Sequence, residues 1–70
     1  MRISGERIEL IMATKGITPF QLAEKSGVSR QTFSTIKSRG TCTPATAAKI
    51  AFGLDSKVED IIVKEDSNNE

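Results

Sequence analysis

The chain has 70 residues, 37% of them hydrophobic and 27% charged, which is the composition of one small globular domain. Because it has no histidine and a single cysteine, Cys42, an internal disulfide is impossible, and we expect a cytoplasmic protein with no catalytic activity, metal or cofactor. The net charge is only +1, and the longest apolar run, Leu10 to Ala13, is too short for a transmembrane helix.

Helix signals follow one another from the start of the chain. Ser4 can cap a first helix over residues 5–15, and Gly16 can end it. The stretch TPFQ at 18–21 combines a capping threonine, a proline suited to the first turn and a glutamine that completes a capping box. A second helix is therefore expected to run from there to the residue before Gly27.

A third helix is predicted over residues 30–38. Ser29 can cap it, and Gly40 can end it. Phe33 and Ile36 lie one turn apart, so they should share the inner face. The connection from the second helix, residues 27–29, is so short that the two helices must cross steeply, as in a helix-turn-helix.

Two further helices are predicted in the second half. Thr43 and Pro44 repeat the cap-then-proline signal and open a fourth helix, whose core stripe has the spacing i, i+3, i+4, i+7 and consists of Ala47, Ile50, Ala51 and Leu54. The stretch SKVE at 56–59 predicts a capping box that opens a short fifth helix, with its inner face formed by Val58, Ile61 and Ile62. Residues 64–70 contain no apolar side chain and should form a disordered acidic tail. We therefore predict an all-α fold, a compact five-helix domain over residues 1–63.

Charge is distributed unevenly along the chain. Residues 1–24 are neutral overall, residues 25–54 carry +5 without a single acid, and residues 55–70 carry −4. This asymmetry indicates that the middle of the chain faces a polyanion. The third helix lies within the basic segment and should present Arg30, Gln31, Ser34, Thr35 and Ser38 to solvent. Such side chains suit DNA, because arginine can pair with guanine, glutamine with adenine, and threonine offers a hydroxyl and a methyl group.

The stretches GITPFQLAEKSGVSRQTFSTIKSRG and TPATAAKIAFGLDSKVEDII resemble the Cro/repressor helix-turn-helix family, the lambda-repressor-like DNA-binding domains. The resemblance spans roughly residues 6–62. It implies that the start of the third helix reads bases through Arg30, Gln31 and Thr35, and we include Ser34 on the same side. It also implies that phosphates are held around the second helix start and the third helix end, and the candidates are Thr18, Ser29, Lys37, Ser38, Arg39 and Thr41.

The chain departs from this family at two informative places. Many members pair an arginine in the first helix with a glutamate near the end of the third, and the matching residues here are Met12 and Lys37. We therefore expect that ion pair to be absent and Lys37 to be free for phosphate. Gly40 comes one residue later than the family's usual glycine, so the third helix or its exit should be longer.

The function implied is a sequence-specific transcriptional regulator, a repressor that places its third helix in the major groove of a roughly palindromic operator. One short helix reads few base pairs, so we expect a homodimer. Its contact is predicted at the exit of the third helix, the connector 41–43 and the region from Phe52 to Val58, including Lys57. With no sensor domain after residue 62, no small-molecule effector is expected. Two alternatives remain: an antitoxin of the same fold, for which the acidic tail would bind the toxin, and a protein-interaction module that does not bind DNA.

Overall fold

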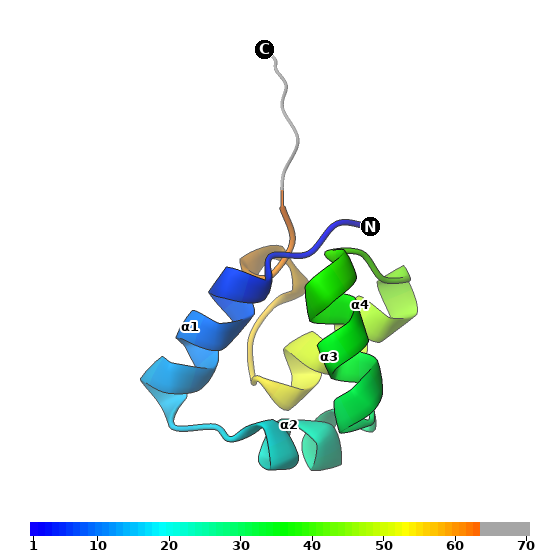
Figure 1. Ribbon diagram of the computed structural model, residues 1–70. Helices are drawn as coiled ribbons and strands as arrows, with labels where there is room; N and C mark the ends of the chain where they lie inside the picture. The colour runs from blue at the N-terminus through cyan, green and yellow to red at the C-terminus, as the bar shows by residue number, and fades with distance from the viewer. Residues whose placement is uncertain (64–70) are drawn as a thin grey trace.

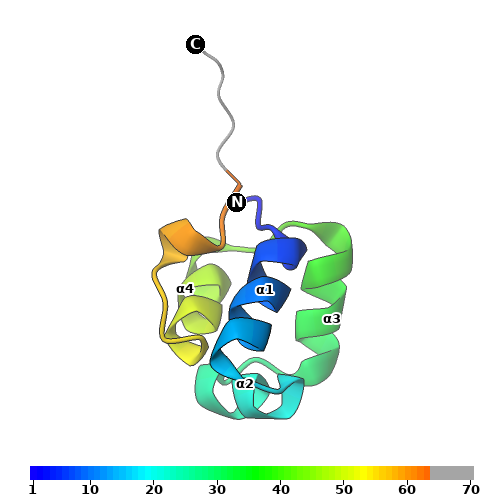
Figure 2. The same cartoon turned by 90° about the vertical axis from the view of Figure 1, so that its left-hand side faces the viewer.

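The computed structural model describes residues 1–63, and in this part of the chain four α-helices enclose one core (Figure 1). In chain order the elements are α1 (Gly5–Lys15), α2 (Pro19–Ser26), α3 (Arg30–Arg39), α4 (Pro44–Gly53) and the 3-10 turn η1 (Val58–Asp60). In Figure 2, α1 faces the viewer, with α4 and η1 on one side of it, α3 on the other and α2 below. None of the helices within residues 1–63 is long and apolar enough to cross a membrane. The tail predicted at 64–70 lies outside the described residues.

The predicted starts of the four α-helices are confirmed by their caps. The Ser4 hydroxyl accepts a hydrogen bond from the backbone N–H of Arg7 at 3.1 Å. The capping box of α2 is complete, because the Thr18 hydroxyl accepts from the Gln21 N–H at 3.1 Å and the Gln21 side chain accepts from the Thr18 N–H at 3.0 Å. At its C-terminal end, α3 extends to Arg39, one residue beyond the predicted end. This agrees with the position of Gly40, one residue later than the family's usual glycine.

The core lies between the inner faces of all four helices. The stripe predicted on α4 is buried throughout, and Phe33 and Ile36 of α3 are buried as predicted. The largest side chains with almost no exposed surface are Ile8, Leu22, Ile50, Leu54 and Ile61. Each α-helix therefore contributes at least one apolar residue to a single core, which is what holds α3 in place.

Gly53, the last residue of α4, lies against α2. A Cβ atom built on Gly53 would lie 2.8 Å from Leu22 Cδ1 and 2.9 Å from Ser26 Cβ, closer than carbon atoms pack. It would also lie 3.1 Å from the backbone nitrogen of Ser26, which cannot rotate away. The absence of a side chain at this position therefore sets how closely the two helices approach.

The prediction of a fifth α-helix is wrong, because the segment forms only the three-residue 3-10 turn η1. Ser56 does not cap it: its hydroxyl donates to the Leu54 carbonyl at 3.2 Å and accepts from the Lys15 ammonium at 3.2 Å. The turn begins one residue later, where the Asp60 carboxylate accepts from the Lys57 N–H at 3.1 Å. A tertiary contact has thus taken the hydroxyl that the local signal assigned to capping.

Lys15 ties the end of α1 to the loop after α4. Its ammonium group donates to the carbonyls of Leu54 at 3.0 Å and Asp55 at 2.8 Å, besides Ser56. Asp55 has a φ of 55°, a left-handed conformation that aspartate tolerates better than most residues. Lys15 therefore binds the carbonyls at and just before this left-handed residue.

The first residues of the chain join two distant segments. Isolated bridges pair Arg2 with Thr41 and Ile3 with Ile62, and the side chain of Ile3 is buried. The Ile3 N–H donates to the Gly40 carbonyl at 2.9 Å. The N-terminal segment therefore lies between the exit of α3 and the end of the described chain, a role that no sequence signal predicted.

Candidate nucleic-acid interface

The connection between α2 and α3 has the geometry of a helix-turn-helix. Gly27 ends α2 with a φ of 76°, a left-handed conformation that glycine adopts without strain. Val28 is buried, and its N–H donates to the hydroxyl of the buried Ser26 at 3.1 Å. Ser29 then caps α3 by accepting from the Thr32 N–H at 3.1 Å. Three residues therefore complete the turn, and the anchored Val28 fixes how α3 projects from the domain.

The α3 helix presents an uninterrupted polar surface. All four side chains predicted to read bases, Arg30, Gln31, Ser34 and Thr35, are exposed on it. In the described part of the chain, no hydrogen bond or ion pair engages the guanidinium of Arg30 or the amide of Gln31. With Phe33 and Ile36 buried below, these groups are left to solvent or to a ligand. The helix contains no acidic residue, so its surface suits an anion.

Two of the predicted phosphate ligands are helix caps. The Thr18 hydroxyl accepts from its own helix, so its proton is still available to an external oxygen. Ser29 differs, because its hydroxyl donates to the Thr32 hydroxyl at 2.9 Å as well as accepting from the Thr32 N–H. The proton of Ser29 is therefore engaged by the Thr32 hydroxyl, whereas capping leaves the proton of Thr18 available.

Lys37 is not free, contrary to the sequence prediction. Its ammonium group forms an ion pair with the carboxylate of Glu9 on α1 and lies 5.3 Å from the centre of the Phe33 ring. Only 29% of its side chain is exposed. The chain therefore does link its first and third helices by an ion pair. The cation, Lys37, is on α3, and the anion, Glu9, is on α1, one turn before Met12, where the family pattern has an arginine.

The end of α3 adjoins a second polar region. Ser38, Arg39 and Thr41 are exposed, and Arg39 has no ion-pair partner among residues 1–63. A hollow of about 610 Å³ opens between α3 and the start of α4. Among the residues that line it are Thr32 and Thr46, which the sequence did not mark as site residues, and Thr43, which it marked only as a helix cap. The frequent threonines within the basic segment 25–54 are the sequence feature that could have indicated these residues.

Cys42 lines the same hollow and is half-buried. Burial raises the pKa of its thiol, and the positive charge of the Met1 amino group opposes part of that change. A raised pKa lowers the thiolate fraction, so Cys42 is poorly suited to act as a nucleophile.

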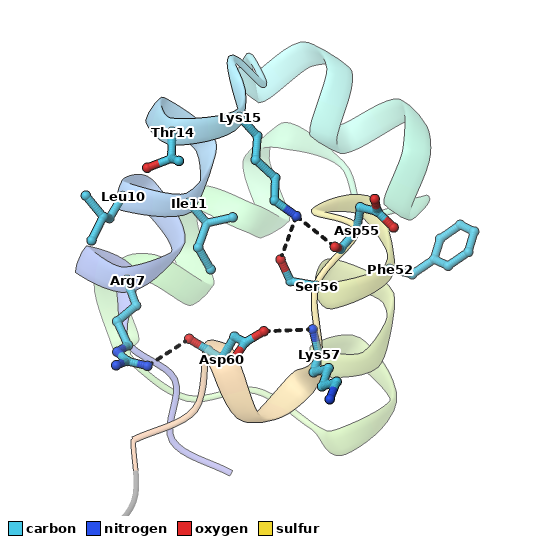
Figure 3. A pocket seen from close by; sticks show the side chains of 10 residues that line it. All are labelled: Arg7, Leu10, Ile11, Thr14, Lys15, Phe52, Asp55, Ser56, Lys57 and Asp60. Atoms are coloured by element: carbon cyan, nitrogen blue, oxygen red, sulfur yellow. Dashed lines mark hydrogen bonds between the residues drawn. The ribbon is translucent and has the colours of Figure 1, made fainter.

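The residues predicted at the dimer contact lie elsewhere. Phe52 is 72% exposed, Lys57 is exposed and Val58 is half-buried. Phe52 and Lys57 border a hollow of about 740 Å³ between α1 and the segment from α4 to η1 (Figure 3). The Phe52 ring points away from this hollow, whereas Ile11 points toward it from α1 (Figure 3). The connector 41–43 borders the other hollow, beside α3, so the predicted contact residues do not share one concave surface.

A comparison with protein families agrees with this geometry. Residues 7–67 match the family model described as the Cro/C1-type HTH DNA-binding domain. Comparisons with curated proteins and with solved structures gave no significant match. The family match spans most of the chain and includes α2, the turn and α3. The chain therefore belongs to the Cro/C1-type helix-turn-helix family of DNA-binding domains.

Proposed function

We propose that this DNA-binding protein is a sequence-specific transcriptional repressor that inserts α3 into the major groove of its operator. The observation that carries the proposal is the exposed side of α3, where Arg30 and Gln31 have no side-chain partner in the described chain. Both side chains can form paired hydrogen bonds to a base edge, arginine to guanine and glutamine to adenine. Ser34 and Thr35 continue the same side one turn further along.

Phosphate contacts are proposed on both sides of this reading surface. Thr18 is well suited at the start of α2, because its hydroxyl proton remains available. At the far end we assign Ser38, Arg39 and Thr41, and Lys37 contributes only when it leaves Glu9. The capping hydroxyl of Ser29 completes the set as an indirect contributor, since it holds the first turn of α3. These contacts set orientation and affinity, whereas the bases set specificity.

We further propose that the protein binds as a homodimer. A helix of ten residues reads only a few base pairs, so two-fold repetition is the usual way to reach a specific site. The contact is assigned to Phe52, Lys57 and Val58, with the connector 41–43 nearer the DNA. Support comes from the outer side of α4, where Ala45 and Ala48 are exposed in helical register with Phe52. Burying one phenylalanine side chain contributes about 1.5–3 kcal/mol per subunit, enough for a weak dimer that operator DNA reinforces.

Selection of bound sequences from random double-stranded DNA tests both parts of the proposal. The expected result is one enriched motif with two-fold symmetry and half-sites about one helical turn apart. An enriched motif without symmetry would retain sequence-specific binding and refute the dimer. Binding without any enriched motif would refute sequence-specific regulation.

A further inference from the structure

The hydroxyl of Thr35 is already engaged within α3. It donates to the backbone carbonyl of Gln31 at 3.0 Å, one turn earlier in the helix. A threonine hydroxyl has one proton, so in this geometry it has none left to donate to a base. The side chain is nevertheless exposed, and it therefore offers a ligand its methyl group and the lone pairs of its oxygen.

This restricts which base edge Thr35 can recognise. The major-groove edge of guanine has two acceptors, N7 and O6, and both need a donor that Thr35 lacks. The amino groups of adenine and cytosine can donate to the Thr35 oxygen, so the choice among the other bases depends on what surrounds its methyl group. Thymine presents a C5-methyl group, which needs only an apolar contact. The adjoining hollow is bordered by further methyl-bearing side chains, Thr32, Ile36 and Thr46. An apolar contact therefore fits both the side chain and its surroundings.

We infer that Thr35 selects thymine through its C5-methyl group, while Gln31 is left to read its base by hydrogen bonds. The inference rests on the proposed sequence-specific function and refines it at one position of each half-site. Burying one methyl group contributes about fourfold in affinity. One turn of helix advances about 5.4 Å, so the two residues address bases one or two pairs apart.

The test uses the full chain and the operator obtained by selection. Each thymine of one half-site is replaced in turn by deoxyuridine, which removes only the C5-methyl group. Affinities are compared for the wild type, Thr35→Val, which keeps the methyl group, and Thr35→Ser, which keeps the hydroxyl. Since Thr35 is exposed, neither substitution disturbs the core.

The wild type and Thr35→Val should each lose about fourfold at one thymine position when it becomes deoxyuridine. Thr35→Ser should bind the unmodified operator about fourfold more weakly than the wild type and show no further loss with deoxyuridine at that position. Two results would overturn the inference. In the first, no deoxyuridine substitution weakens binding of the operator by the wild type. In the second, Thr35→Val binds the unmodified operator more weakly than the wild type, whereas Thr35→Ser does not. Neither would affect the proposed function, which fails separately if selection yields no motif.

Discussion

Lys37 on α3 and Glu9 on α1 form an ion pair that holds the last turns of α3 against the first helix. The same ammonium group lies over the Phe33 ring, so the lysine is drawn inward, toward α1, by two favourable contacts. A DNA phosphate would have to compete with Glu9 for this charge. If Lys37 is a phosphate ligand as proposed, breaking the pair should change the strength of non-specific DNA binding.

Substituting Glu9 by glutamine should release Lys37 and strengthen binding to random DNA. Log affinity should fall more steeply with log salt concentration, by about one unit for each additional phosphate that the protein neutralises. Loss of the partly exposed pair should lower the free energy of unfolding by at most about 1 kcal/mol. Glu6→Gln is the matched control, because it removes the same charge from the same helix without touching Lys37. Equal effects of the two substitutions on the salt dependence would show that Lys37 stays away from DNA.

Arg30 and Arg39, at opposite ends of α3, should differ in the kind of binding that they support. Arg30→Ala should weaken operator binding by about 1–3 kcal/mol and relax the preference at one base position per half-site. Arg39→Ala should weaken operator and random DNA alike and lower the salt slope by about one unit per subunit. Titrations of both variants at several salt concentrations separate these effects. A loss on random DNA for Arg30→Ala as large as its loss on the operator would make Arg30 a phosphate ligand instead.

Gly53→Ala should destabilise the domain even though alanine favours helices. Its Cβ would meet Leu22 and the backbone of Ser26, so α2 and α4 must separate. Overpacking of this kind costs about 1–3 kcal/mol in the free energy of unfolding. Gly5→Ala is the control, since its Cβ would lie 3.6 Å from Lys37, an ordinary contact, and it should be neutral or slightly stabilising. Urea unfolding followed by circular dichroism measures both, and an unchanged midpoint for Gly53→Ala would refute the close contact.

Phe52→Glu should yield a folded monomer with weak operator affinity. The ring is 72% exposed, so its replacement leaves the core intact, while a carboxylate cannot be buried across a two-fold contact. Phe20→Glu makes the same change at the exposed start of α2, outside the proposed contact, and should remain dimeric. Analytical ultracentrifugation gives the oligomeric state, and circular dichroism verifies folding. If Phe52→Glu sediments as a dimer, the contact lies elsewhere.

Most of the fold could be predicted because local chemistry determines where these helices begin and end. Thr18 and Gln21, three positions apart in the sequence, form the capping box of α2, and Gly27 ends this helix because glycine adopts the left-handed conformation without strain. The fifth helix could not be predicted in the same way. Its proposed cap, Ser56, binds Lys15 from a helix far away in sequence, and nothing local reveals that competitor.

The same distinction applies to the DNA-binding surface. The exposed side of α3 follows from helical period once Phe33 and Ile36 are assigned to the core. The pairing of Lys37 with Glu9 depends on how α1 crosses α3, which is a property of the whole domain. The hydrogen bond from Thr35 to Gln31 is local, but threonine has more than one accessible rotamer in a helix, so the sequence does not choose between them.

Residues 2–4 pair with the last described residues, so the two ends of the fold lie side by side. The Ser4 N–H donates to the Ile61 carbonyl at 2.8 Å, and the Val63 N–H donates to the Arg2 carbonyl at 3.0 Å. The two ends of the described fold are thus adjacent, as circular permutation requires. A short flexible linker from residue 63 back to residue 2, with the chain reopened in the exposed turn at Gly16, would keep all four helices whole. In such a permutant α2, the turn and α3 would come first in the chain, and α1 would follow as the closing segment.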